Sequence, residues 1–148
     1  MIADLYQQLI LDHTRHPHNK GIPATFDKMA CGYNPLCGDK VTLYLKLNKD
    51  VNEDLHFEGS GCAISTASVS ILTDFLKGKK ISEIPPLFKS YQDLVTGKQI
   101  SENEKEILEK MVIFEGVKEF PMRVKCATLS WHTLKAALEN KPEPVSTE

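Results

Sequence analysis

The feature that most constrains the fold of this chain is a set of four donor residues on three separate segments. These residues are Cys37, Asp39, Cys62 and Cys126. Three thiolates and one carboxylate make one four-coordinate site for a soft or borderline metal, and the site forms only if the fold brings the segments together. A site that only stabilises a fold more often has four cysteines, or three cysteines and a histidine. The weaker aspartate ligand therefore indicates a site that has to open.

The composition excludes several classes of protein. At 148 residues the chain has the length of one domain that buries a core without disulfides. Eighteen Lys and Arg against 20 Asp and Glu give a formal net charge of −2 without a basic stripe, so nucleic acid is not an expected ligand. No apolar run approaches the ~18 residues of a membrane span, and the amino-terminal residues lack a secretory signal pattern. We therefore expect a cytoplasmic protein without a membrane partner, whose four cysteines are thiols or metal ligands.

Periodicity along the chain predicts an α+β fold. Apolar residues at three- and four-residue steps predict a first helix that ends near Arg15–Pro17. Alternation predicts a hairpin of strands at 41–47 and 55–57, and residues 29–33 are a weaker third strand. We expect a small antiparallel sheet of about three strands, with one wet face and one face covered by helices.

Four more helices are expected after the hairpin, and their limits follow from glycine, proline and a capping box. Residues 1–140 are expected to form a single domain, and the polar, proline-containing stretch 141–148 is expected to be a disordered tail. The expected helices lie at 64–76, at 87–95, from Ser101–Glu104 through Met111 and Val112, and from Pro121 onward.

The four donors are predicted to lie at the ends of these elements. Cys37 and Asp39 lie in the loop before the first long strand, Cys62 lies at a strand-to-helix junction, and Cys126 lies near the start of the last helix. Because a helix amino terminus stabilises negative charge, a lowered thiol pKa is expected for Cys62 and Cys126. Neighbouring glycines are expected to let the backbone approach the metal; they are Gly38, Gly59 and Gly61.

Other candidate residues have a weaker case. Cys31 stands in an apolar, strand-like segment and is expected to fill the core or an edge strand, without a chemical role. His13, His16 and His18 are not expected to bind metal, because three thiolates outcompete imidazole for it.

Two cationic side chains lie just before Cys126 in the sequence. A zinc site with four anionic ligands carries a formal charge of about −2. Arg123 and Lys125 could offset that charge through contacts with the ligands, without binding the metal themselves. The alternative is that both are solvated cations at a helix start.

Whole segments around the donors resemble a known family. Residues 34–39, 57–65 and 123–131 resemble the three ligand segments of the U-type iron–sulfur assembly proteins, which comprise IscU, SufU and the amino-terminal domain of NifU. Residues 12–19 resemble the family's first helix and its exit. The resemblance implies a SufE/NifU-like fold. It also implies that the three cysteines and the aspartate hold zinc or a nascent iron–sulfur cluster, and that a cysteine desulfurase delivers sulfur to them as persulfide.

Within that family the chain is more similar to SufU. Lys125 stands where IscU-type scaffolds have histidine, and extra residues around 85–99 resemble the insertion typical of SufU. This similarity implies a zinc-dependent sulfur acceptor for a SufS-like desulfurase, which hands sulfur to downstream iron–sulfur assembly proteins and has no independent turnover. Cys37 is the predicted acceptor, because its loop can move away from the metal at the least structural cost.

Two alternatives to this function stay open at the level of sequence. In the first, the same four residues are a scaffold on which a [2Fe–2S] cluster is built and passed on. In the second, the chain is a zinc-stabilised interaction domain without sulfur chemistry.

Overall fold

The computed structural model describes residues 2–147, and the side chains of residues 4–147. Met1 and Glu148, the outer ends of the expected domain and tail, lie outside this part. The element order is α1 (Ile2–Arg15), β1 (Lys28–Asn34), β2 (Asp39–Asn48), β3 (Val51–Ser60), α2 (Ala63–Leu76), the 3₁₀ helix η1 (Ile81–Glu83), α3 (Ile84–Val95), α4 (Glu102–Leu108), the 3₁₀ helix η2 (Glu109–Glu119), α5 (Pro121–Leu138) and β4 (Val145–Ser146).

The sheet of the described chain has four strands in the order β3-β2-β1-β4. The pairs β1–β2 and β2–β3 are antiparallel, whereas β4 runs parallel to β1. The predicted α+β class is confirmed, but the predicted count of about three strands is one short and the sheet is mixed. The additional strand, Val145–Ser146, belongs to the stretch expected to be a disordered tail, and two residues are too few to show a strand periodicity.

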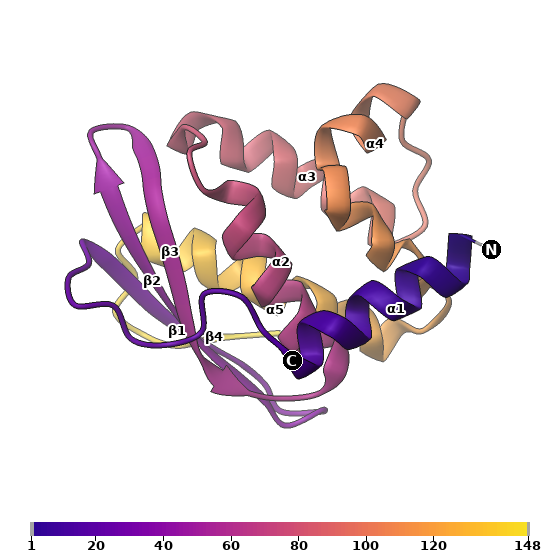
Figure 1. Ribbon diagram of the computed structural model, residues 1–148, viewed down its shortest axis with the longest axis horizontal. Helices are drawn as coiled ribbons and strands as arrows, with labels where there is room; N and C mark the ends of the chain where they lie inside the picture. Colours follow the sequence, from indigo (N-terminus) through magenta and orange to yellow (C-terminus); the bar gives the residue numbers. More distant parts are fainter. Residues whose placement is uncertain (1, 148) are drawn as a thin grey trace.

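Helices cover one face of the sheet, as predicted (Figure 1). Helix α5 packs on β1 and β2, α2 packs on β3, and α1 packs on α2. The face under the helices buries Leu43, Leu45 and Leu55 completely, whereas Lys40 and Lys46 of β2 are exposed. This is the period-two pattern that the sequence predicts for a half-buried sheet.

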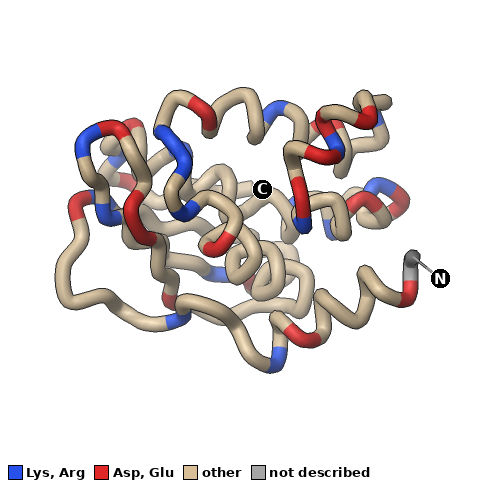
Figure 2. The backbone as a smooth tube through the Cα atoms, turned by 45° about the horizontal axis from the view of Figure 1, so that its top comes forward, with Lys and Arg blue, Asp and Glu red and all other residues tan. Residues whose placement is uncertain are grey.

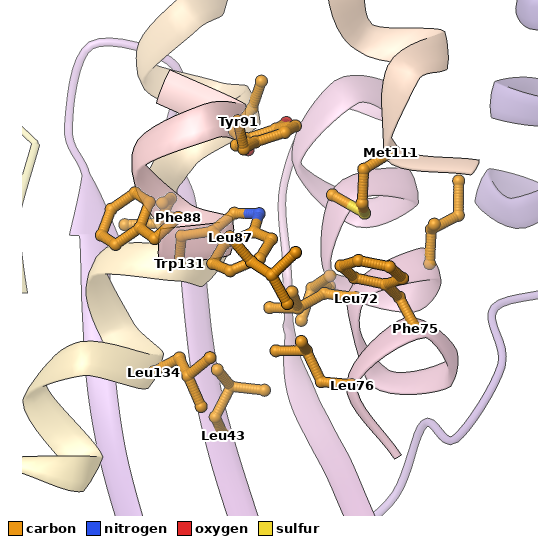
Figure 3. Close-up of a cluster of buried hydrophobic side chains, with 14 of the residues drawn as sticks. Leu43, Leu72, Phe75, Leu76, Leu87, Phe88, Tyr91, Met111, Trp131 and Leu134 are labelled. Atoms are coloured by element: carbon orange, nitrogen blue, oxygen red, sulfur yellow. The ribbon is translucent and has the colours of Figure 1, made fainter. Parts of the chain in front are cut away.

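The core between the sheet and the outer helices is built around Trp131 of α5 (Figure 3). Its ring stacks on Phe88 and on Tyr91 of α3, at 5.4 Å between ring centroids in both cases. Phe75 of α2 meets the same ring edge-on at 6.4 Å. These aromatic contacts link α3 to α5, and α5 to α2, and they contribute about 0.5–1.5 kcal/mol per pair beyond area burial.

Two hydrogen bonds determine how α5 sits against its neighbours. The carbonyl of Ala127 accepts a hydrogen bond from Ser68 Oγ of α2 at 2.7 Å and one from the Tyr91 hydroxyl of α3 at 2.8 Å. Because Ala127 follows Cys126 in the chain and Ser68 lies on the helix that begins after Cys62, these bonds set the positions of the two cysteines relative to each other.

Two helix limits differ from the prediction. Helix α3 begins at Ile84 instead of residue 87, since Pro85 and Pro86 lie in its first turn, where no intrahelical N–H is required. Helix α4 has the predicted capping box at Ser101 and Glu104 but ends at Leu108, because Glu109 has a φ of +51°. The predicted continuation through Met111 and Val112 is η2 instead.

Basic and acidic positions are interspersed over the elements in Figure 2. Among residues 2–147, no helix combines the length and the hydropathy needed to cross a membrane.

Candidate metal centre

The β1–β2 hairpin positions two of the four predicted ligands. Residues 35–38 form the turn, and Gly38 adopts a φ of +69°, in the left-handed region that favours glycine. Cys37 is half-buried in this turn, and the Cys37 N–H donates a hydrogen bond to the Asn34 carbonyl at 3.3 Å. Asp39 is the first residue of β2 and is buried. The predicted loop position of Cys37 is therefore confirmed.

The third predicted ligand, Cys62, is the residue that caps the amino terminus of α2. Its sulfur accepts a hydrogen bond from the Ser65 N–H at 3.4 Å, and its own N–H donates to Asp39 Oδ1 at 2.8 Å. A hydrogen bond thus links the junction between β3 and α2 to the first residue of β2. The predicted location of Cys62 at a strand-to-helix junction is confirmed.

At Gly61 the backbone approaches a candidate ligand, Asp39, closely. A Cβ atom on Gly61 would lie 2.5 Å from Asp39 Oδ1, which leaves no room for a side chain. Gly59 is equally constrained, but by the neighbouring strand: its Cβ would lie 2.1 Å from the Lys40 carbonyl oxygen. At Gly38 a Cβ would meet nothing within 4 Å, so the backbone angle and not the space around the residue requires glycine there.

The fourth predicted ligand, Cys126, lies in the second turn of α5 and is 1% exposed. The sulfur atoms of Cys37 and Cys126 and a carboxylate oxygen of Asp39 all lie within 4.8 Å of one another. Cys62 Sγ lies 3.9 Å from Asp39 Oδ2. The fold therefore brings together all four residues that the sequence singles out, from three segments of the chain.

The structure contradicts the expected lowering of the thiol pKa values of Cys62 and Cys126. Burial raises the pKa of Cys62, and this effect outweighs the opposing hydrogen bond from the Ser65 N–H. Burial also raises the pKa of Cys126, and neighbouring Cys37, Asp39 and Cys62 add to the shift. Cys126 lies beyond the first turn of α5, out of reach of the free N–H groups at the helix start.

Asn34, the last residue of β1, is a site residue that the sequence reasoning missed. It is 0% exposed, and its Nδ2 donates to Asp39 Oδ2 at 3.1 Å and to Cys126 Sγ at 3.2 Å. A signal for it exists in the strand period, because Asn34 has the same parity as buried Ala30 and Gly32. An amide on the covered face of a strand requires a buried partner.

A groove of about 760 Å³ opens onto the three cysteines of the site. Apart from the cysteines, most of its lining is apolar and comes from α1, the start of α2, η2 and the residue that precedes α5. The apolar residues include Tyr6, Ile10, Leu11, Ile113, Val117 and Phe120.

The two cations near Cys126 differ in position. Arg123 is exposed, lines this groove, and holds its guanidinium over the Phe120 ring at 5.5 Å. Lys125 is half-buried on α5. A charge-compensating role for either residue stays a prediction.

The remaining cysteine and the histidines lie outside the donor cluster. Cys31 contacts Thr42 across the β1–β2 pair, at 3.3 Å between Sγ and Oγ1. His13 is buried and its Nδ1 lies 2.7 Å from Ser70 Oγ, while His18 pairs with Asp74. His16 is exposed after α1.

The NifU-like N terminal domain family matches residues 5–127 of this chain. The chain belongs to this family. The NifU-like chain is 42% identical over 132 residues to the zinc-dependent sulfurtransferase SufU of Bacillus subtilis (strain 168), a match that covers 88% of this chain and 87% of the relative. It is 38% identical over 135 residues to the iron–sulfur cluster assembly scaffold protein IscU of Streptococcus pyogenes serotype M1, covering 91% and 83% of the two chains.

The same family likeness holds in three dimensions. The crystal structure of an iron–sulfur cluster assembly scaffold protein for the SUF system from Fervidobacterium islandicum AW-1 superimposes on this NifU-like chain with a TM-score of 0.79. The two chains are 38% identical, and the match covers 88% of this chain and 94% of the other. The resemblance to U-type assembly proteins inferred from the ligand segments is confirmed.

Proposed function

We propose that this chain is an iron–sulfur cluster assembly protein that acts as a zinc-dependent sulfur acceptor for a cysteine desulfurase. The observation that carries the proposal is the meeting of Cys37, Asp39, Cys62 and Cys126, with the three cysteines lining one groove. The identity of 42% to a zinc-dependent sulfurtransferase supports sulfur transfer as the role of that cluster.

The donor set fits zinc. Asp39 and Cys126 are 2% and 1% exposed, so their ionised forms are stable side by side only with a compensating cation. Three sulfurs and one oxygen are ligands that Zn²⁺ accepts in four-coordinate sites. Cys37, Asp39, Cys62 and Cys126 are the residues that would hold it. Zinc, when bound, would keep these thiols ionised at neutral pH.

Cys37 is the residue that accepts sulfur in this proposal. It is half-buried in a turn at the groove, whereas Cys62 caps α2 and Cys126 is buried within α5. The turn therefore moves with less disturbance to the fold than either helix. The Cys37 thiolate attacks the outer sulfur of a persulfide on the desulfurase. A new S–S bond forms at Cys37 Sγ, the S–S bond of the donor breaks, and the donor cysteine leaves as a thiolate with the bonding electron pair, so no oxidant is needed.

The groove supplies the approach for the donor. Its apolar lining around the three cysteines suits contact with a protein surface that carries the persulfide, and Arg123 adds a cation to the same lining. The sulfur then passes from Cys37 to downstream iron–sulfur assembly proteins.

A scaffold role is the second candidate, because IscU scaffold proteins are also among the relatives, at 38% identity in one case. In that role the same four residues would hold a [2Fe–2S] cluster as cargo. Metal analysis of the purified protein separates the two candidates: zinc without acid-labile sulfide supports the acceptor role, and iron with sulfide supports the scaffold.

The decisive experiment incubates the protein with a SufS-like cysteine desulfurase, pyridoxal phosphate and cysteine, then maps persulfide by peptide mass spectrometry. We expect the added sulfur on Cys37, and we expect Cys37→Ala to abolish stimulation of desulfurase turnover while Cys31→Ala retains it. Persulfide mainly on Cys126, with stimulation intact in Cys37→Ala, would overturn the proposal. Stimulation that is indifferent to metal removal would favour a zinc-stabilised interaction domain.

A further inference from the structure

Asn34 donates both of its side-chain hydrogen bonds to candidate metal ligands. The residue ends β1 opposite Asp39, its partner across the hairpin, and it is completely buried. Its Nδ2 donates at 3.1 Å to Asp39 Oδ2 and at 3.2 Å to Cys126 Sγ. Asn34 Oδ1 has no hydrogen-bond partner in the described part of the chain. With the amide turned over, this oxygen would face a carboxylate and a sulfur, which are both acceptors, so the side chain is placed for its donor group.

The four candidate ligands consequently differ in the support they receive. The Asp39 carboxylate accepts one hydrogen bond at each oxygen, from the Cys62 N–H at Oδ1 and from Asn34 Nδ2 at Oδ2. Cys126 Sγ accepts from Asn34, and Cys62 Sγ accepts from the Ser65 N–H. Within residues 2–147, no N–H group donates to the sulfur of Cys37, the fourth donor.

Hydrogen bonds from N–H groups influence which ligand remains bound to the metal and which one reacts as a nucleophile. An N–H donated to an anionic ligand stabilises its charge and fixes its orientation, and such partners outside the ligand set tune both affinity and reactivity. A thiolate without that donation keeps more of its electron density and is the better nucleophile. The pattern at this site therefore favours reaction at Cys37 over Cys126.

We infer that Asn34 is a positioning residue that holds Asp39 and Cys126 as the stationary half of the site and thereby directs sulfur chemistry to Cys37. This inference rests on the proposed function, since it concerns the same zinc-binding, sulfur-accepting cluster. Asn34 itself exchanges no atom with the substrate. Its two donated hydrogen bonds act through the ligands that they orient.

The chain contains a matched control for this role. Asn52 is also 0% exposed, its Oδ1 also lacks a partner among the described residues, and its Nδ2 donates to the Leu76 carbonyl at 3.2 Å. Asn34→Asp and Asn52→Asp therefore make the same near-isosteric change at two equally buried amides. Only the first variant places a new carboxyl group against Asp39 and Cys126.

The test measures zinc affinity by competition with a chromogenic chelator, and it measures which of the three site cysteines, Cys37, Cys62 and Cys126, iodoacetamide alkylates first in the zinc-loaded protein. For Asn34→Asp we expect affinity to fall by about 10- to 100-fold, and alkylation to spread from Cys37 to Cys126. Asn52→Asp should keep the wild-type affinity and the wild-type alkylation pattern. Asn34→Ala, which removes the donor without adding an acidic group, should shift both readouts in the same direction if the Asp variant does not fold.

The outcomes separate this inference from the function on which it rests. A wild-type protein that binds no zinc would overturn both. A wild-type protein that binds zinc, together with Asn34 variants of unchanged affinity, would overturn the inference alone. If Asn34 variants bind zinc more weakly but alkylation stays confined to Cys37, Asn34 has only a structural role and the directing role is refuted. Alkylation that begins at Cys126 in the wild type would also refute the directing role.

Discussion

The N–H of Cys62 donates a hydrogen bond to the Asp39 carboxylate at 2.8 Å, and so joins the amino terminus of α2 to the first residue of β2. The other carboxylate oxygen accepts from Asn34 on β1. One side chain thus connects three elements at the centre of the site. A change that moves Asp39 should therefore alter metal binding and the packing of the sheet against α2 together.

Gly61→Ala should disturb the site without touching a ligand. The new Cβ would lie 2.5 Å from Asp39 Oδ1, so the carboxylate has to move, and we expect a loss of about 1–3 kcal/mol in the free energy of unfolding together with weaker zinc binding. Gly116→Ala is the control, because a Cβ there would meet nothing within 4 Å. Urea unfolding and zinc competition check both variants, and equal values for Gly61→Ala and the wild type would contradict the packing at Asp39.

Cys62→Ser should lower both the zinc content and the melting temperature. Structural zinc contributes ~10–16 kcal/mol of apparent binding energy in small zinc peptides, comparable with the ~5–15 kcal/mol net stability of a whole domain. Elemental analysis and a thermal melt of the purified variant are sufficient. Full zinc occupancy with unchanged melting would remove Cys62 from the ligand set.

Cys31→Ala should keep both zinc and the effect on a desulfurase. Its sulfur contacts Thr42 Oγ1 at 3.3 Å on the sheet, outside the donor cluster, so the loss in unfolding free energy should stay within about 1 kcal/mol. Metal analysis beside a turnover assay measures this. A stoichiometric loss of zinc would show that the ligand assignment is wrong.

Stability should fall in mild acid because of His13. Burial, with His18 as the next contribution, lowers the pKa of His13 in the folded protein below the ordinary value of 6.5. The folded state therefore disfavours the imidazolium, so the stabilisation is complete above pH 6.5 and is lost as the pH falls toward the folded pKa. His13 Nδ1 lies 2.7 Å from Ser70 Oγ, which also accepts a hydrogen bond from the His18 backbone N–H. Protonation of His13 would place a positive charge in this buried position.

The measurement is urea unfolding between about pH 5 and pH 8. His13→Gln should flatten the pH dependence relative to the wild type, and His16→Gln, at an exposed histidine, should leave it unchanged. Burial also lowers the pKa of His132, so a residual slope is expected in His13→Gln. Identical slopes for His13→Gln and the wild type would refute the role of His13.

Local patterns were enough to predict much of the fold and the members of the candidate cluster. Alternating Val41, Leu43 and Leu45 report a strand with one buried face, because side chains on a strand repeat every two residues. Cys62 before an apolar helix stripe correctly predicts a residue at the helix amino terminus. Both signals depend only on neighbours in the chain.

Features that depend on distant contacts were not predictable in this way. The importance of Asn34 arises from its partner Cys126, 92 residues away. The raised pKa of Cys126 results from burial among residues of other segments, which no helix-start rule describes. The end of α4 at Leu108 follows from the left-handed backbone of Glu109, a residue with no strong sequence preference for it.

Strand β4 has a practical consequence for handling the protein. Val145 and Ser146 pair with Gly32 and Tyr33, and the Thr147 N–H donates to the Tyr33 carbonyl at 3.0 Å. At the opposite edge of the sheet, the Gly21 N–H donates to the Phe57 carbonyl of β3, and the Phe57 N–H donates to the Asn19 carbonyl. Trimming the chain at residue 140, the expected domain limit, would expose the edge of β1 that pairs with β4. The unpaired N–H and C=O groups of β1 could then bind a strand of another molecule. We therefore expect a chain trimmed at residue 140 to self-associate more than one that keeps residues 145–147.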